Sequence, residues 1–262
     1  MGILLPILIL GGLGVAFGAG LAFASKKLEV KNDPRLDRIM GLLPGANCGA
    51  CGGAGCFAFA EAVLKGEMDL NSCRASEVDA KAKIAEVLGK KAEKNTKKIA
   101  FLHCSGGDKV ENKYAYDGIK DCLAASQLLG GPKKCYSGCI GFASCAAACP
   151  FGAINMDAVA GLPVVDALKC RSCGKCAAVC PKRLFSLQAE KHKVYVACRS
   201  RESIALKRGY CKAACIACRK CEKTCPSGAI KVEGNLAVID YTKCTSCFAC
   251  VEACPVKVIK KR

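Results

Sequence analysis

Three stretches of this chain repeat the pattern C-x2-C-x2-C-x3-C-P without deviation, beginning at Cys170, Cys215 and Cys244. In bacterial ferredoxins this run supplies three thiolates to one [4Fe–4S] cube and a fourth to the neighbouring cube. The pattern therefore predicts pairs of clusters between which an electron can move. The cysteines of the runs are Cys170, Cys173, Cys176 and Cys180; Cys215, Cys218, Cys221 and Cys225; and Cys244, Cys247, Cys250 and Cys254.

The chain has 24 cysteines in 262 residues, and cysteine has two other common uses. Disulfide frameworks belong to short secreted chains in oxidising compartments. Zinc ribbons use two separate C-x2-C pairs rather than four cysteines in one run followed by proline. Iron–sulfur ligation is therefore favoured, and because it needs a reducing space we expect the cysteine-rich part in the cytoplasm.

The formal net charge of +18 counts every cysteine as neutral. A [4Fe–4S]²⁺ core with four thiolates carries −2, so five cubes would reduce the charge to about +8 and six to about +6. No basic motif with interleaved aromatic residues is present, so we expect no nucleic-acid binding. The remaining positive charge suits an acidic protein partner or an anionic membrane surface.

Residues 2–24 carry no charge, and at about 1.5 Å per residue they are long enough to cross a bilayer. A signal peptide is the competing interpretation, because Ala22-Phe23-Ala24 resembles a cleavage site, but no Lys or Arg precedes the apolar run. Lys26 and Lys27 follow it, which favours a single-pass anchor in the cell inner membrane with the cluster domains on the cytoplasmic side. Small residues spaced four apart in this segment favour packing against a partner helix.

A second cysteine pattern, C-x2-C-x4-C-x16-C, is formed by Cys48, Cys51, Cys56 and Cys73 in a glycine-rich context. Bare backbone can wrap a cube there, and a helix over 57–64 would return the chain to Cys73. We predict a [4Fe–4S] site, with zinc as the alternative. Other local predictions are a polar link at 31–38, a helix at 76–88 with an S-x-x-D capping box, a solvated linker at 90–98, a strand at 99–103 and a helix at 118–129.

The chain also contains an internal repeat at an offset of 76 residues. Cys135, Cys139, Cys145 and Cys149 align with Cys211, Cys215, Cys221 and Cys225, while Phe142 occupies the place of Cys218. Cys122 aligns with Cys198. A strand–turn–strand is expected at 154–165 and again at 230–239. Each copy is predicted to be a ferredoxin-like module with two clusters.

The crossing rule of ferredoxins assigns the ligands of these modules. Cys135 is predicted to replace the absent middle ligand, and Cys104, Cys122, Cys198 and Cys211 either hold a sixth cube or are structural thiols. His103 beside Cys104 is favoured as a core imidazole rather than a ligand. The predicted groups are Cys215, Cys218, Cys221 and Cys254; Cys244, Cys247, Cys250 and Cys225; Cys170, Cys173, Cys176 and Cys149; and Cys139, Cys145, Cys180 and Cys135.

The fold class expected is α+β with an N-terminal transmembrane helix, a four-Cys domain and two tandem ferredoxin-like modules. The sequence has no Walker A loop, no G-x-G-x-x-G after a strand and no visible flavin site, so two-electron chemistry is expected on another polypeptide. The predicted domains are 1–25, the anchor; 26–89, the four-Cys domain; 90–132, a linker with a small α/β segment; 133–190, the first module; and 191–262, the second module.

The chain resembles the B subunit of the Rnf complex over essentially its whole length. The motifs that carry the resemblance are residues 45–51 (GANCGAC) with Gly55-Cys56, and residues 131–135 (GPKKC) with Cys139-Ile140-Gly141. The longer form, with two ferredoxin modules, is similar to that of anaerobic bacteria. The resemblance implies a membrane complex that passes electrons from reduced ferredoxin to NAD⁺ while exporting Na⁺ or H⁺, with the flavin-bearing and NAD-binding sites on other subunits.

Two other functions are alternatives: a membrane-tethered polyferredoxin that serves another reductase or hydrogenase, and a zinc-binding scaffold. Ferredoxins are usually acidic, so basic residues beside the C-terminal module are candidates for docking. They are Arg219, Lys220, Lys223, Lys243, Lys257, Lys260, Lys261 and Arg262.

Overall fold

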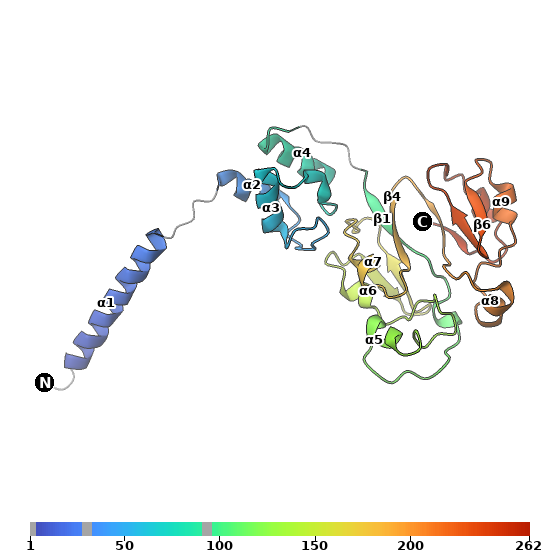
Figure 1. Ribbon diagram of the computed structural model, residues 1–262, viewed down its shortest axis with the longest axis horizontal. Helices are drawn as coiled ribbons and strands as arrows, with labels where there is room; N and C mark the ends of the chain where they lie inside the picture. Colours follow the sequence, from blue (N-terminus) through green and yellow to red (C-terminus); the bar gives the residue numbers. More distant parts are fainter. Residues whose placement is uncertain (1–3, 28–32, 91–95) are drawn as a thin grey trace.

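The computed structural model describes residues 4–27, 33–90 and 96–262 and contains both helices and strands. Helix α1 (Leu4–Lys27) stands apart from the rest of the chain (Figure 1). Its span Ile7–Lys27 is long and apolar enough to cross a membrane, and none of that span is buried against the protein. Two lysines, Lys26 and Lys27, occupy its last turn.

The predicted four-Cys domain is described from residue 33 onward and is helical. It contains α2 (Pro34–Leu42), α3 (Cys56–Lys65), a 3-10 turn η1 (Leu70–Ser72) and α4 (Val78–Val87). Ile39, Phe59 and Ile84 are fully buried between these helices. The helix predicted over 57–64 is confirmed as α3, which places Cys56 at its first residue.

Two local predictions in this domain are wrong. Residues 34–38 do not form the expected polar link but begin α2, because Asp33 accepts a hydrogen bond from the Arg35 N–H and Pro34 suits the first turn; residues 31 and 32 lie outside the described residues. The capping box at Ser76 does not form. Glu77, one residue after Ser76, is the N-cap of α4, and its side chain makes no capping hydrogen bond. The Ser76 hydroxyl therefore does not cap the helix, and it has no hydrogen-bond partner in the described chain.

The first repeat, residues 98–189, begins with β1 (Lys98–Leu102), which confirms the strand expected at 99–103. β1 pairs antiparallel with β4 (Phe185–Ala189), with Lys98 opposite Ala189 and Leu102 opposite Phe185. A 3-10 turn η2 (Gly107–Lys109) and α5 (Cys122–Gln127) follow β1. The helix predicted over 118–129 is therefore shorter, because the Asp121 carboxylate caps it by accepting from the Ala124 N–H at 2.9 Å.

The remaining elements of the first repeat are α6 (Ser144–Ala147), the hairpin β2 (Ile154–Asp157) with β3 (Leu162–Val165), and α7 (Lys175–Val179). The hairpin confirms the strand–turn–strand expected at 154–165. Leu184 and Phe185 pack with Ile99, Ile154 and Leu162 in the core of this repeat. Several cysteines belong to the same core, so the loops that carry them are held against a packed interior.

The second repeat, residues 194–261, has the same kinds of element. β5 (Val194–Val196) pairs antiparallel with β8 (Ile259–Lys261), and β6 (Ile230–Glu233) forms a hairpin with β7 (Leu236–Ile239), which confirms the second strand–turn–strand. Gly234 and Asn235 both have positive φ, as a two-residue hairpin turn requires. The helices are α8 (Ile204–Tyr210), α9 (Lys220–Thr224) and α10 (Ala249–Glu252).

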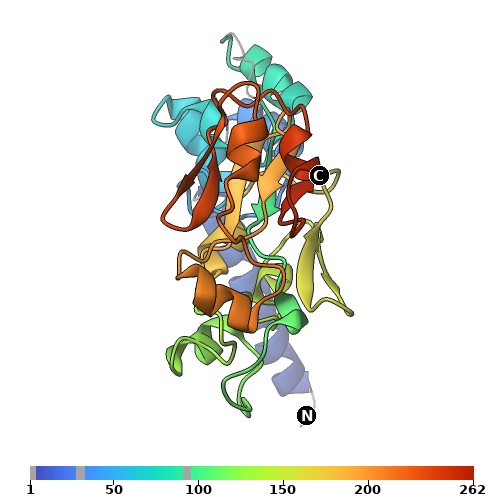
Figure 2. The ribbon, with the colours of Figure 1, turned by 90° about the vertical axis from the view of Figure 1, so that its right-hand side faces the viewer.

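The four-Cys domain, the first repeat and the second repeat follow one another along the long axis (Figure 1). Figure 2 views the molecule from the end occupied by the second repeat, whose helices and hairpin lie in front. The two repeats meet where Phe101 of β1 stacks on Tyr195 of β5, with ring centroids 4.9 Å apart. The four-Cys domain meets the first repeat through an ion pair between Glu77 and Arg171.

Candidate iron–sulfur sites

Four loops in the two repeats share one unusual backbone. In each, the residues two and four positions after the first cysteine have positive φ, although most of them are not glycine. Alternating conformations of this kind turn successive N–H groups toward one point and form a nest for an anion, as at many Fe–S sites. The residues are Gly141 and Ala143, Ser172 and Gly174, Ala217 and Arg219, and Ser246 and Phe248.

The loop that contains Phe142 thus has the same nest as the three complete ferredoxin runs. After each nest a short helix begins and carries the third cysteine into the core; these buried residues are Cys145, Cys176, Cys221 and Cys250. The backbone is therefore shaped to hold a cluster at all four loops, and only the thiolate at position 142 is missing.

Backbone N–H groups also point at the sulfurs of the fourth cysteines. The N–H groups of Ala153 and Ala229 donate to the Sγ atoms of Cys149 and Cys225 at 3.4 and 3.3 Å. Leu184 N–H donates to Cys180 Sγ at 3.5 Å. Hydrogen bonds to cluster sulfurs stabilise the more negative, reduced state of an iron–sulfur cluster.

In the second repeat, one cavity is lined by Cys215, Cys218, Cys221 and Cys254, the four thiols that the crossing rule assigns to one cube. Cys250 belongs to the second predicted group, with Cys225, Cys244 and Cys247. Burial, followed by the charges of Cys244, Cys247 and Cys225, raises the pKa of Cys250 to about 11. The Cys250 thiol therefore stays protonated at neutral pH until a cationic core replaces its proton.

One site in the first repeat has the arrangement that the spacing assigns. Burial and the charges of Cys170 and Cys173 raise the pKa of Cys176 to about 12. Cys173 in turn lies near Cys149 and Cys170, and burial is again the main reason that its pKa is raised. The structure thus brings Cys149, Cys170, Cys173 and Cys176 together.

The other site in this repeat is different from the predicted group. Its cavity is lined by Cys122, Cys139, Cys145 and Cys180, and Cys135 is not among the lining residues. Cys122 is the first residue of α5, and its N–H donates to the Ser144 hydroxyl at 2.8 Å. Ser144 precedes Cys145 in α6, so this hydrogen bond fixes Cys122 beside the third cysteine of the loop.

Cys135 lies instead with Cys104, Cys198 and Cys211. Cys135 and Cys211 are buried in one small core with Val110 and Ala214, and Cys198 packs against it. Burial and the charges of Cys104 and Cys198 raise the pKa of Cys135 to about 12, while a hydrogen bond with Tyr210 opposes that rise. Spacing alone could not reveal this group, because its members come from distant parts of the sequence.

The cysteines of the four-Cys domain surround its glycine-rich loop. Cys56 and Cys73 are buried, and Cys48 and Cys51 are half-buried against the same core. Asn47 closes the loop by accepting from the Cys56 N–H at 2.8 Å. Cys173 of the first repeat also packs against this core, so the four-Cys domain and the first repeat bring their thiols close to each other.

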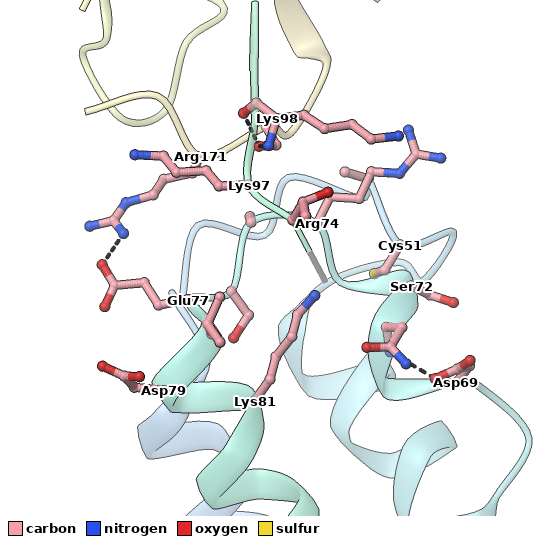
Figure 3. Close-up of a pocket in the computed structure, with 17 residues that line it drawn as sticks. Cys51, Asp69, Ser72, Arg74, Glu77, Asp79, Lys81, Lys97, Lys98 and Arg171 are labelled. Atoms are coloured by element: carbon pink, nitrogen blue, oxygen red, sulfur yellow. Dashed lines mark hydrogen bonds and ion pairs between the residues drawn. The ribbon is translucent and has the colours of Figure 1, made fainter. Parts of the chain in front are cut away.

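A pocket of about 690 Å³ lies between the four-Cys domain and the first repeat, and Cys51 is part of its wall (Figure 3). The labelled side chains around it are mostly charged, with Arg74, Lys97 and Lys98 near its upper rim and Lys81 pointing into it from α4. Lys81 is buried, and desolvation lowers its pKa although Cys73 and Asp69 oppose the shift.

The two histidines have structural surroundings. Nδ1 of His103 donates to the Val196 carbonyl oxygen at 2.8 Å, and its Nε2 is 2.7 Å from the Ser186 hydroxyl. His192 is buried against the ring of Tyr241.

Over residues 4–27, 33–90 and 96–262, no three His, Cys, Asp or Glu side chains converge on a point that could hold a single metal ion.

The loops, nests and grouped thiols are those of an iron–sulfur protein of the ferredoxin type. A family model for an Fe–S cluster matches residues 43–75, and a model for the 4Fe-4S dicluster domain matches residues 134–184 and 214–258. Both matches lie on the regions in which the structure groups the cysteines.

Three relatives match nearly the whole chain. The chain is 42% identical over 98% of its length to the B subunit of the ion-translocating oxidoreductase complex of Methanosarcina acetivorans, covering 97% of that protein. It is 43% identical to the B subunit of the Na⁺-translocating ferredoxin:NAD⁺ oxidoreductase complex of Acetobacterium woodii and covers 77% of that protein. It is 38% identical to the B subunit of the proton-translocating ferredoxin:NAD⁺ oxidoreductase complex of Clostridium ljungdahlii and covers 92% of that protein. The chain belongs to the family of B subunits of the ion-translocating (Rnf) oxidoreductase complexes.

Proposed function

We propose that this chain is the subunit that accepts electrons from reduced ferredoxin and relays them within a membrane complex that reduces NAD⁺ and transports Na⁺ or H⁺. The names of the Acetobacterium and Clostridium relatives state the ferredoxin:NAD⁺ reaction and the two ions. Each transfer along the relay moves one electron from a reduced donor to the next acceptor. Two electrons and one proton convert NAD⁺ to NADH on a partner subunit, since this sequence has no nucleotide-binding loop.

The relay rests on [4Fe–4S] cubes held by the grouped cysteines. Four sets follow the sequence spacing: Cys48, Cys51, Cys56 and Cys73; Cys149, Cys170, Cys173 and Cys176; Cys215, Cys218, Cys221 and Cys254; and Cys225, Cys244, Cys247 and Cys250. A fifth cube uses Cys139, Cys145 and Cys180. The proposed domains are the anchor (1–25), the four-Cys domain (26–89), the connecting segment (90–132), whose strand β1 pairs with β4 of the first module, and two ferredoxin-like modules (133–190 and 191–262).

The observation that carries this proposal is the difference in exposure of the middle cysteines. Cys218 and Cys247 of the second repeat are exposed, whereas Cys173 of the first repeat is half-buried against the four-Cys domain. Electrons tunnel only over short distances, so an external donor must approach a cluster near the surface. The second repeat is therefore the proposed site of electron uptake.

The charges around these exposed cysteines suit an acidic donor. Most of the basic residues predicted for docking are exposed, including Lys220, Lys223 and Lys257. Arg219 and Lys243 lie 4.0 and 3.9 Å from the carboxylates of Glu222 and Asp240, so part of their charge is compensated. Complementary charge raises the association rate more than the affinity, which suits a carrier that binds, delivers an electron and leaves.

We further propose that α1 anchors the chain with the four-Cys domain and both repeats on the cytoplasmic side. Lys26 and Lys27 at the C-terminal end of α1 support this orientation through the positive-inside rule. The four-Cys domain then lies nearest the membrane in the sequence and is the proposed exit of the relay.

Affinity purification under anaerobic conditions in mild detergent tests the proposed assembly. We expect the tagged chain to retain flavin-bearing and NAD-binding membrane subunits, and a version that lacks residues 1–27 to be recovered without the membrane. Recovery of the full chain alone, with its iron intact, would contradict a role as a subunit of such a complex.

A further inference from the structure

The two repeats bring corresponding cysteines to the place where they meet. Cys104 lies two residues after the last residue of β1, and Cys198 lies two residues after the last residue of β5. Both strands pair with the last strand of their own repeat, so these cysteines have equivalent positions. Cys135 and Cys211 are also equivalent, because each precedes the first cysteine of its loop by four residues.

Hydrogen bonds between the repeats fix this contact on both sides of Cys104. His103 binds the carbonyl oxygen of Val196 through its ring, and the Ser105 hydroxyl donates to the carbonyl oxygen of Ala197 at 2.9 Å. The segments 103–105 and 196–198 therefore run side by side, and Cys104 is held next to Cys198.

The sulfurs of the group face the same small space. A Cβ atom placed on Gly106 would lie 3.3 Å from Cys211 Sγ and 3.9 Å from Cys104 Sγ, so the two sulfurs are at most 7.2 Å apart, the sum of these distances. The same Cβ would be 2.6 Å from Val110, so a side chain at Gly106 would disturb the packing beside both thiols. Glycine thus keeps the space between these cysteines open.

Cys198 is half-buried and Cys211 is buried, and backbone N–H groups are directed at both sulfurs. Burial is the largest influence on both and raises their pKa values. It is opposed at Cys198 by hydrogen bonds from the backbone of Cys215 and Ser200, and at Cys211 by hydrogen bonds from the backbone of Ala213 and Ala214. Backbone N–H groups directed at buried sulfurs are a feature of iron–sulfur sites.

We propose that Cys104, Cys135, Cys198 and Cys211 hold a sixth [4Fe–4S] cube between the two repeats, and that Cys122 completes the cube of Cys139, Cys145 and Cys180. This inference rests on the proposed electron-relay function and deepens it. The four new ligands form two equivalent pairs, one from each repeat. With Cys122 assigned to the cavity that it lines, all 24 cysteines of the chain have a place.

The sixth cube joins the two repeats electrically. Cys104 and Cys139 pack against the same core of the first repeat, and Cys198 packs against the core of the second repeat that contains Cys215. A cube held by Cys104, Cys135, Cys198 and Cys211 would therefore lie between the sites of Cys215 and Cys139 and could pass one electron at a time between them. Without it the first and second repeats each hold a pair of cubes with no cluster at their contact.

The first experiment counts iron and acid-labile sulfide in the full chain purified anaerobically. Six cubes contain about 24 iron atoms per chain and five contain about 20. The variant C104A/C211A removes two of the four proposed ligands of the sixth cube, one from each repeat. Alanine is chosen because serine can supply an oxygen ligand. We expect it to lose about four iron atoms, and the spectroscopic signal of one cube, while the remaining cubes stay reducible.

A second pair of variants separates the two parts of the proposal. We expect C122A to lose iron from one cube and C135A from another, so that the double variant loses the iron of both, about eight atoms. If Cys135 were instead the fourth ligand of the cube of Cys139, C135A would affect that cube and C122A would keep its iron.

A control away from the contact is Y114F, which removes the hydrogen bond from the Tyr114 hydroxyl to the Leu128 carbonyl oxygen and no thiol. We expect it to retain about 24 iron atoms. The proposal is overturned if the unaltered chain holds about 20 iron atoms, or if C104A/C211A loses none. If C104A/C211A lost the iron of every site, C135A alone would decide, because loss of about four iron atoms supports the sixth cube and loss of none overturns it. In that case the proposed relay through the other five cubes would remain.

Discussion

Replacing Ser227 by alanine is expected to lower the reduction potential of one cube, the cube proposed for Cys225, Cys244, Cys247 and Cys250. The Ser227 hydroxyl lies 3.6 Å from Cys225 Sγ, and the Ala229 N–H donates to the same sulfur at 3.3 Å. Burial alone would raise the pKa of Cys225, but these hydrogen bonds outweigh it and the pKa is lowered. The same bonds favour the extra negative charge of a reduced cluster.

The size of the effect follows from the strength of such a bond. A hydrogen bond to an ionised group contributes about 1.5–3 kcal/mol, and the long distance places this one at the low end. Because a long hydrogen bond of this kind contributes about 1.5 kcal/mol in total, we take about 1 kcal/mol of it to differ between the oxidised and reduced states. Since about 1.4 kcal/mol corresponds to about 59 mV for one electron, we expect the potential to fall by about 40 mV in S227A.

Redox titration followed by electron paramagnetic resonance measures this change. S227T keeps the hydroxyl and is the matched control, for which we expect the potential of the original chain. The equivalent position in the first repeat is Phe151, so the cube of Cys149 has no such hydroxyl to lose. Equal potentials in S227A, S227T and the original chain, with full iron content in all three, would refute a contribution of the Ser227 hydroxyl to the potential of this cube.

Three further outcomes are expected. The rate of electron delivery from ferredoxin should fall steeply between low and physiological ionic strength. K220E/K223E should slow delivery on the order of tenfold, whereas the control K83E on the four-Cys domain should not. A rate insensitive to both salt and charge reversal would place electron uptake elsewhere. F59A should destabilise the four-Cys domain by about 3–5 kcal/mol in anaerobic denaturation, because Phe59 is 1% exposed; F57A, at 49% exposure on the same helix, is the control. Fusing α1 alone to a soluble protein should bring that protein to the membrane, and its absence there would contradict the anchor.

The sequence predicted the local parts of the fold well because their information is local. Each ferredoxin run contains its loop, its short helix and three of the thiols of a group within eleven residues, so spacing predicts geometry directly. Both hairpins were predicted for the same reason. The helix α2 was missed although Leu36, Ile39, Met40 and Leu43 have helical spacing after Asp33-Pro34, because the charged residues between them favour a link.

The grouping of the irregular cysteines could not be predicted in this way. The 76-residue offset aligned Cys122 with Cys198, whereas the strands make Cys104 the equivalent of Cys198. The inserted segment between β1 and α5 carries Cys122 to the cavity that Cys139 and Cys145 also line, and it leaves Cys135 at the contact of the repeats. Only strand pairing and packing between distant segments reveal that exchange.

We propose that this chain carries electrons from reduced ferredoxin toward NAD⁺. The most direct test mixes reduced ferredoxin and NAD⁺ anaerobically with membranes that contain the complex, and with membranes from which this chain alone has been removed. We predict that NADH forms only in the first, and that adding back the intact chain restores it while a cluster-free chain does not. NADH formation at an undiminished rate without this chain would contradict the account.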